Sequence, residues 1–430
     1  MAKEPRTGVQ HQADLTVVRY QLPTVFSPGS PVTDTRFLAG RAGQIDRALA
    51  AVAQVGQHAV IYGERGVGKT SVASLIHMIW TEYIKDYEIV AARVQCDPTD
   101  TYASVWQKVA EAIQRDFVKR ELKPAANGAF DECAAMIEAG NATPTQVTNF
   151  FDLGGKKAIV VIDEFDTVED YEAPGLMAST IKQLSDFAID ATVVLVGVAD
   201  SVDDLIAEHA SIDRCLVQVF MPRMSPAELT QIVESRLLRV GMTIEPKQVL
   251  RIAGLAQGFP YYAHLLGLHS AIHAADARRS LTVQAPDVNE AIKQSITQTQ
   301  QSILTDYTKA ITSPRPENLY KQTLLACALT KADDLGYFAP ADVKEPMTRV
   351  MKKARDVPSF VKQIKALTDS ERGPALEQAG EHRKLRFRFA HALLKPYVVF
   401  RGVDEGLIDE SEAYQYAQPD VARQLSLFDA

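Results

Sequence analysis

Glycines, a lysine and a threonine follow the spacing Gly63-x-x-x-x-Gly68-Lys69-Thr70 within the stretch HAVIYGERGVGKTSVASLI. Glycines let a loop turn its backbone amides inward, and a helix that starts at the loop adds partial positive charge, so the stretch can hold phosphates. We expect Lys69 to reach the terminal phosphates of a nucleotide and the Thr70 hydroxyl to bind Mg²⁺. The predicted binding loop comprises Gly63, Glu64, Arg65, Gly66, Val67, Gly68, Lys69, Thr70 and Ser71.

Two adjacent carboxylates follow an apolar run further along the chain. The segment AIVVIDE places Asp163 and Glu164 at the end of a predicted strand. Asp163 suits the carboxylate linked to Mg²⁺, and Glu164 suits the group that orients and polarises an attacking water. Two carboxylates can also simply end a strand, but the phosphate-binding loop in the same chain favours the paired assignment.

Two more polar residues stand at predicted strand ends. Asp200 ends VVLVGVAD, where a polar side chain could touch the γ-phosphate, and Arg214 precedes a strand in HASIDRCLVQVF. An arginine in that place can be offered to the nucleotide of a neighbouring subunit and stabilise developing phosphate charge. A salt bridge at the protein surface is the alternative for Arg214.

Strand-like and helical segments alternate from Phe37 to about Met221. Strands are expected at HAVIYG, EIVAARVQC, KAIVVIDE and ATVVLVGVA, with a helix between each strand and the next. This alternation predicts an α/β fold in which helices cover both faces of a parallel sheet. Ligands of such sheets bind beside the carboxyl ends of the strands, where the motifs above are expected to meet.

The segments on either side of this core have a different character. Residues 1–33 are polar and contain prolines, and we expect an N-terminal arm with one short strand, LTVVRY. After the core at 34–222, residues 223–300 show only helical patterns and predict a helical lid. Residues 301–410 suggest three short helices and then two strand-like segments in RKLRFRFAHALLKPYVVF, the order of a winged-helix domain, and residues 411–430 form a tail.

The composition is that of a soluble globular protein. Hydrophobic residues make up 46% and charged residues 23% of the 430 positions. The four cysteines are scattered, which argues for a reducing cytoplasm and against a zinc ribbon or a disulfide framework. We expect neither a secretory signal nor a membrane partner, because the N-terminus lacks an apolar core and the apolar runs are too short to span a bilayer.

Positive charge is concentrated near the C-terminus of a chain whose net charge is −8. Between Lys344 and Arg401, fourteen Lys and Arg residues face six Asp and Glu. In EHRKLRFRF, period-two alternation would put arginines on one face and phenylalanines in the core. The residues expected to contact duplex DNA phosphates are Arg383, Lys384, Arg386 and Arg388. A solvated surface or a protein partner is the alternative.

In this order, the motifs resemble an AAA+ ATPase module of the branch shared by origin-recognition initiators and STAND-type signalling ATPases. The resemblance rests on FLAGR (Phe37–Arg41), the glycine loop, VIDE, VGVAD, SIDR and GFPYYAHLL. It implies ATP and Mg²⁺ as cofactors and a self-oligomer. It also implies that FLAGR, with Gly40 and Arg41, lines the adenine pocket, that Asp200 is the first sensor residue and that Arg214 is the candidate finger.

The lid departs from the initiator pattern at GFPYY. Initiators carry an arginine just after a Gly-x-x stretch, whereas here Tyr261 follows Gly258-Phe259-Pro260. A Gly-x-Pro resembles STAND switches, in which the proline lies near adenine, although Pro260 could simply begin a helix. Loss of the cation should slow turnover, which favours a nucleotide-gated switch over a fast motor.

The last residues, RQLSLFDA, resemble the bacterial sliding-clamp-binding pentapeptide. Leu427 and Phe428 would enter an apolar pocket of the clamp, with Gln424 at its rim and Leu425 beside it. The alternative is a tail that packs on its own domain.

Taken together, these features predict an ATP-binding, slowly hydrolysing AAA+ switch that acts on or near DNA in replication, transposition or antiviral defence. The alternative is a STAND-like sensor ATPase that oligomerises on a protein or nucleic-acid cue and regulates a separate effector.

Overall fold

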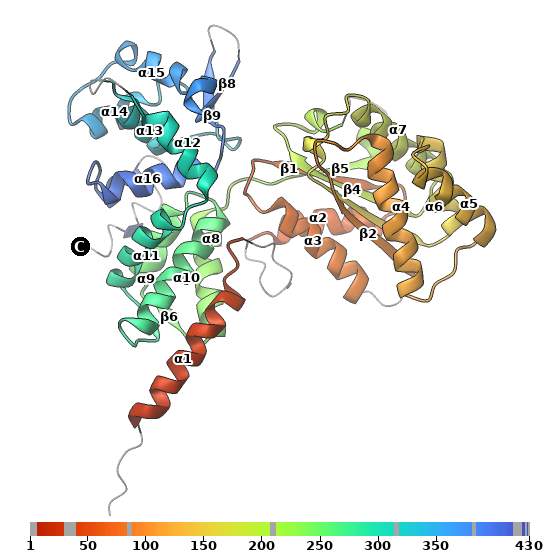
Figure 1. The fold of residues 1–430 in the computed structure, drawn as a ribbon, viewed down its shortest axis with the longest axis horizontal. Coiled ribbons are helices and arrows are strands. Elements are labelled where there is room, and N and C mark those ends of the chain that lie inside the picture. Colours follow the sequence, from red (N-terminus) through yellow and green to blue (C-terminus); the bar gives the residue numbers. More distant parts are fainter. Residues whose placement is uncertain are drawn as a thin grey trace, which may run out of the picture. The chain divides into compact units, whose positions relative to one another are not determined.

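The computed structural model describes residues 7–29, 40–83, 88–206, 212–313, 318–380, 384–415, 424–425 and 428. The chain divides into two compact units (Figure 1). The first comprises Met1–Ser30, Arg65–Val67 and Arg223–Ala430, and the second comprises Pro31–Glu64 and Gly68–Pro222.

The second unit is built on a five-stranded sheet with the order β2-β3-β4-β1-β5. All of its strand pairs are parallel, which confirms the predicted architecture. The central strands are buried along nearly their whole length because helices cover both faces, as parallel sheets require. The strands are β1 (His58–Gly63), β2 (Ile89–Gln95), β3 (Lys157–Asp163), β4 (Ala191–Val198) and β5 (Leu216–Phe220).

Two helices of this unit begin at side-chain caps. Thr101 caps α4 by accepting from the Ser104 amide, and Thr143 caps α6 by accepting from the Gln146 amide. Three helices stand between β2 and β3, where the sequence predicted only one. Trp106 of the first helix packs against Phe151 of the third in the core of this unit. The helices are α2 (Ala42–Ala53), α3 (Lys69–Met78), the π-helix Ile79–Tyr83, α4 (Tyr102–Lys119), α5 (Asn127–Glu138), α6 (Pro144–Gly154) and α7 (Ala173–Asp186).

The first unit contains the helices of the predicted lid together with an N-terminal helix. The lid consists of α8 (Pro226–Arg239), α9 (Pro246–Leu255), α10 (Pro260–Asp276) and α11 (Ala285–Thr297). Two short strands, β6 (Thr243–Ile244) and β7 (Thr282–Val283), pair in parallel between these helices.

The predicted short strand LTVVRY is wrong, because this segment belongs to helix α1 (Thr7–Val25), which lies against α10 and α8. Leu15, Val18 and Leu22 are buried, and their spacing of three and four residues is that of one helix face. Phe26 follows on the same side and fills the space beside Gly267, where an added Cβ would lie 2.7 Å from the ring. The described part of the arm is therefore mainly a docked helix, which adds buried apolar residues to the core of the lid.

The C-terminal domain contains the predicted three helices and a hairpin whose first strand lies before the segments predicted as strands. The helices are α13 (Tyr320–Leu329), α14 (Lys344–Met351) and α15 (Val361–Ala366), and β8 (Leu376–Ala379) pairs antiparallel with β9 (Arg386–Phe389). Phe338, between the first two helices, forms a bridge to Phe387. Three helices and then a hairpin is the order of a winged-helix domain, but only RFRF of the two predicted strand segments is a strand, and the winged-helix assignment itself stays an interpretation.

The second strand-like segment, LKPYVVF, is helical and not a strand. It forms α16 (Leu394–Asp404), in which every residue from Leu394 to Phe400 is buried, so its continuous apolar run does not distinguish strand from helix. Two further helices, α12 (Gln301–Ile311) and α17 (Glu410–Gln415), flank this domain in sequence. Among the described residues, none of the helices combines the length and apolar character that a membrane crossing requires.

Candidate nucleotide-binding site

The glycine loop joins the end of β1 to the start of α3, and its glycines adopt a backbone that other residues avoid. Gly63, Gly66 and Gly68 have φ values of 141°, 86° and 96°. A Cβ at Gly63 would lie 2.5 Å from the Met221 carbonyl oxygen, whereas the corresponding space at Gly68 is open. The loop is therefore shaped by neighbouring backbone on one side and leaves room before the N-terminus of α3, the place where helices bind phosphate.

Lys69, the first residue of α3, is turned back over the loop. Its Nζ donates to the carbonyl oxygens of Gly63 and Glu64, both at 2.9 Å. The side chain is buried, so its charge is held among backbone groups of the loop that precedes it. This position suits a cation that serves the terminal phosphates of a nucleotide.

Thr70 and Asp163 come together from different elements, as predicted for the Mg²⁺ ligands. Thr70 Oγ1 donates to Asp163 Oδ1 at 3.3 Å. Burial raises the pKa of the Asp163 carboxyl, while the Thr70 hydrogen bond and the Arg93 guanidinium, 3.6 Å from Oδ2, oppose that rise. A hydroxyl and a carboxylate side by side are oxygen ligands of the kind Mg²⁺ prefers, so these residues fit the ion. When bound, Mg²⁺ would supply positive charge against the phosphates.

Glu164 stands next to Asp163 at the end of β3, in a backbone conformation that is uncommon for glutamate. Its φ is 58°, in the left-handed region, and such strain is concentrated at functional sites. The Glu164 amide donates to Asp163 Oδ1 at 3.0 Å, and the Glu164 carbonyl accepts from Thr167 Oγ1 at 2.7 Å. These bonds fix the Glu164 backbone and leave its carboxylate to be placed by another residue.

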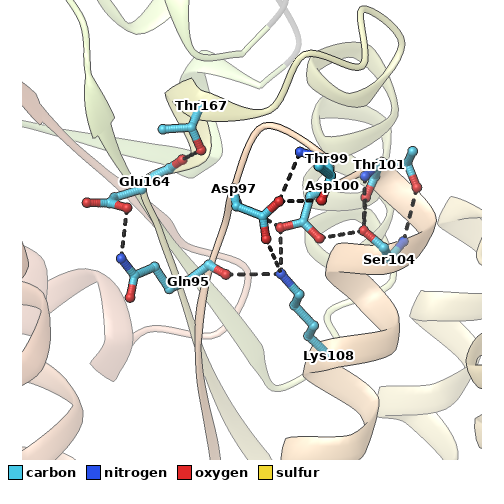
Figure 2. A network of polar contacts seen from close by, with 9 residues as sticks. All are labelled: Gln95, Asp97, Thr99, Asp100, Thr101, Ser104, Lys108, Glu164 and Thr167. Atoms are coloured by element: carbon cyan, nitrogen blue, oxygen red, sulfur yellow. Dashed lines mark hydrogen bonds and ion pairs between the residues drawn. The ribbon is translucent and has the colours of Figure 1, made fainter.

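That residue is Gln95, at the end of β2. Gln95 Nε2 donates to Glu164 Oε2 at 2.8 Å (Figure 2). The two meet because Gln95 pairs with Asp163 in the register of β2 and β3. Sequence reasoning missed Gln95; the available signal was a polar residue ending the strand predicted before AIVVIDE.

The turn after Gln95 is held by one lysine. Lys108 Nζ, from α4, donates to the Gln95 carbonyl at 3.3 Å, to Asp97 Oδ2 at 3.4 Å and to Asp100 Oδ2 at 2.6 Å (Figure 2). Ser104 Oγ donates to the other oxygen of Asp100 at 2.7 Å. This network connects α4 to the residue that holds Glu164.

Asp200 follows β4 at the same sheet edge, as predicted. It is half-buried, and its amide donates to Asp204 Oδ2 at 3.2 Å. Because β4 lies between β3 and β1 in the sheet, this position is next to the glycine loop and the acidic pair. Contact with a γ-phosphate stays a prediction.

Arg214 lies at the opposite edge of the sheet. It belongs to the turn Asp213–Cys215 before β5, which runs parallel to β1, so it stands at the amino end of the strands. Its side chain is 69% exposed and forms an ion pair with Asp186. Arg214 therefore cannot serve the nucleotide of its own protomer, and a role toward a neighbouring subunit stays a prediction.

The residues predicted to line the adenine pocket are only partly described. Phe37, Leu38 and Ala39 lie outside the described residues; Gly40 is exposed, and Arg41 is buried with Nη2 donating to the Pro222 carbonyl at 2.6 Å. In the first unit, Pro260 begins α10 in the first helical turn, the alternative noted above. Its contact with adenine stays a prediction.

The predicted DNA-contacting residues are partly engaged with the protein itself. Arg386 pairs with Asp333 at 2.8 Å and Arg388 pairs with Glu377 at 2.9 Å, and both guanidinium groups lie over the Tyr337 ring. The predicted alternation is confirmed, since Phe387 and Phe389 are buried. Lys384 is exposed, and Arg383 lies outside the described residues.

The tail motif is also partly described. Leu425 is buried, whereas Gln424 is exposed and Phe428 is 49% exposed. Leu427 lies outside the described residues. At least one apolar residue of the pentapeptide is therefore covered by the chain itself.

The sequence matches the family Novel STAND NTPase 1 over residues 31–334. The chain belongs to this family. No curated protein matches it. With the sheet order and the glycine loop, this membership makes the chain a P-loop NTPase of the AAA+ fold, and its glycine loop and Thr70–Asp163 pair fit ATP with Mg²⁺.

Several solved structures are similar to this ATPase over nearly its whole length. The ORC1 protein of Aeropyrum pernix in complex with DNA is 16% identical, with a TM-score of 0.48 and coverage of 93% of this chain and 97% of that one. Cdc6p from Pyrobaculum aerophilum is 16% identical, with a TM-score of 0.45 and coverage of 90% and 99%. A Walker-type ATPase of Pyrococcus abyssi is 12% identical, with a TM-score of 0.48 and coverage of 87% and 99%.

Proposed function

We propose that this ATPase is a nucleotide-gated switch in which hydrolysis is slow because the water-orienting carboxylate is restrained. The hydrogen bond from Gln95 to Glu164, at 2.8 Å, carries the proposal. A carboxylate whose oxygen is held by an amide donor is not free to align a water. Release of Glu164 from Gln95 would start hydrolysis, and the bond would keep ATP intact until then.

The other residues of the site have binding roles in this proposal. The glycine loop and Lys69 bind the phosphates, and Thr70 with Asp163 would hold Mg²⁺. Glu164, once released, orients the water and accepts its proton. The state of the γ-phosphate then determines the conformation and assembly of the chain.

The proposal predicts different assembly states with ATP and with ADP. Light scattering of the full chain after size exclusion should give one mass or radius with ATP and another with ADP. Glu164→Gln should bind ATP and stay in the ATP state, since it keeps the side-chain shape but cannot accept the proton. Lys69→Ala should behave as nucleotide-free protein throughout. Identical profiles of the wild-type chain with ATP, ADP and no nucleotide would refute the switch.

Duplex DNA is the favoured partner of this switch, because positive charge is concentrated between Lys344 and Arg401. Since Arg386 and Arg388 are engaged in ion pairs, we assign the main contribution to Arg383 and Lys384. Arg383→Gln with Lys384→Gln should weaken duplex binding and reduce the salt slope by about 2, at about 1 for each phosphate contact.

Lys123→Gln with Lys182→Gln removes the same charge from exposed positions of the core and is the matched control. Equal affinities of the two double variants would contradict DNA binding through this hairpin. A wild-type chain that binds no duplex would instead favour the STAND-like sensor of a protein cue that regulates a separate effector.

The tail adds a bacterial sliding clamp as a second candidate partner, supported by its sequence and the half-exposed Phe428. Clamp capture by the full chain should disappear in Leu427→Ala with Phe428→Ala. Gln424→Glu should weaken it, and Ala430→Ser should leave it unchanged. Capture that survives loss of both apolar residues would exclude this motif.

A further inference from the structure

We propose that the core unit carries a second phosphate-binding site, separate from the glycine loop, in a groove between α4 and the end of α3. This pocket, here called the α4 groove, has a volume of about 460 Å³, and Ala91 of β2 lies at its base. Its polar lining consists of His77, Thr81, Arg115, Asp116, Lys119 and Arg120.

The α4 groove carries more positive than negative charge. Arg115 and Lys119 stand one helical turn apart on α4, and neither side chain has a hydrogen bond or ion pair with any described residue. Arg120 uses Nε to bind Asp116 Oδ2 at 2.7 Å, and the same oxygen accepts from the Ala91 amide at 2.8 Å. The one carboxylate among the described lining residues is therefore engaged, and the side chains of Arg115 and Lys119 have no partner among the described residues.

The side of the groove formed by α3 and the π-helix contributes neutral polar groups. Thr81 Oγ1 donates to the His77 carbonyl at 2.9 Å, and both residues line the groove. Burial lowers the pKa of His77, and the cations Arg93, Arg120 and Lys119 lower it further, against an opposing effect of Asp116. These cations near the imidazole place positive charge on this side of the groove.

Stabilisation of the helix end does not account for this arrangement. Cations in the last turn of a helix interact favourably with its dipole, which explains Lys119 and Arg120. Arg115 lies more than a turn from the C-terminus of α4, where this effect has faded. A guanidinium, an ammonium and an imidazole that face one groove are instead the donor set typical of a bound phosphate.

The groove is distinct from the nucleotide site. His77 lies eight residues along α3 from Lys69, a distance of about 12 Å at 1.5 Å per residue. The ligand chemistry is that of a phosphate group, whose source is either a free phosphorylated molecule or the backbone of a nucleic-acid strand.

The test compares two double variants of the full chain in excess Mg²⁺–ADP. Arg115→Gln with Lys119→Gln removes the free cations of the groove, and Lys123→Gln with Lys182→Gln removes equal charge from exposed positions that do not line it. The probes are inorganic pyrophosphate, measured by calorimetry, and a labelled single-stranded oligonucleotide, measured by anisotropy. Equal melting temperatures of the variants establish that both are folded.

We expect pyrophosphate affinity to fall by about tenfold or more in the groove variant and to be unchanged in the control. Loss of oligonucleotide affinity as well would identify a nucleic-acid strand as the source, and its retention would identify a free phosphorylated molecule. Equal affinities of both variants for both probes would overturn the proposal.

A second measurement keeps the proposal testable if a variant is unstable. NMR titration of the wild-type chain should show the pKa of His77 rise when pyrophosphate is added, because a bound anion favours the imidazolium. His77→Gln identifies the resonance. An unchanged pKa of His77 in saturating pyrophosphate would also overturn the proposal.

Discussion

At the scale of single residues, the nucleotide site depends on a few polar contacts, and these differ in how firmly they hold the side chain. Lys69 is buried, and two carbonyl oxygens fix the position of its Nζ over the loop. The Glu164 carboxylate is held by one amide, that of Gln95, so loss of this single hydrogen bond would free the carboxylate to orient a water.

Lys69→Ala is expected to abolish ATP binding, because it removes the cation that serves the terminal phosphates. Calorimetry with ATP and Mg²⁺ measures the loss, and Lys182→Ala, at an exposed position on α7, is the control. Retained affinity in Lys69→Ala would refute the assignment of the glycine loop.

Gln95→Leu is expected to raise the rate of ATP hydrolysis several-fold, since it frees the Glu164 carboxylate without changing the phosphate ligands. Single-turnover hydrolysis separates this rate from nucleotide exchange. The double variant Gln95→Leu with Glu164→Gln should be as slow as Glu164→Gln alone. If Gln95→Leu slows hydrolysis instead, the hydrogen bond positions Glu164 for catalysis and does not restrain it.

At the scale of the elements, the sheet contains a buried histidine that should make the core acid-sensitive. His58 in β1 is fully buried, its Nδ1 accepts from the Val193 amide at 3.0 Å, and burial lowers its pKa from 6.5 to about 3. The unfolded chain binds this proton near pH 6.5 and the folded chain does not. The contribution of neutral His58 to the free energy of unfolding should therefore be fully present above pH 6.5. It should decline as pH falls toward 3, by up to about 1.4 kcal/mol per pH unit.

His58→Asn tests this, because its amide oxygen can still accept from Val193 but does not titrate. Chemical unfolding at several pH values should give a shallower slope for the variant than for the wild-type chain. An equal slope would mean that other groups, such as the buried His264, account for the whole acid dependence.

Helix α1 should contribute strongly to the stability of the lid. Phe26→Ala removes a ring that is 1% exposed and leaves a cavity beside Gly267, which is expected to cost about 3–5 kcal/mol. Val17→Ala, on the exposed face of the same helix, should change stability by less than about 0.5 kcal/mol. Urea unfolding measures both, and equal effects would contradict the docking of α1.

The elements that the sequence predicted correctly are those whose pattern is local. The strands beside the glycine loop and the acidic pair are short apolar runs with clear ends, so their types and positions follow from the residues alone. Helix α1 was missed because LTVVRY is rich in β-branched residues, which favour strands. Only its contact with α10 shows that the apolar residues follow the helical period and not the strand period. The helicity of LKPYVVF was hidden in the same way by burial on all sides.

At the scale of the whole molecule, the order of motifs that lie far apart in the sequence was enough to predict the family and the AAA+ fold. Lys69, Thr70, Asp163 and Glu164 were predictable because each stands at the end of a strand or the start of a helix. Gln95 also ends a strand, but its contact with Glu164 depends on the register of β2 beside β3, and the α4 groove depends on the packing of α3 near α4. Such contacts between distant segments have no local signature in a single sequence.

The docking of α1 also affects how the protein can be shortened. Removal of the first thirty residues, on the view that they are a polar leader, would expose the apolar surface of α8 and α10. Leu15, Leu22 and Phe26 are buried where α1 lies against these helices. Shortened chains should therefore aggregate during expression. A polar substitution on that surface of α8 or α10 should restore their solubility better than any change near the nucleotide site.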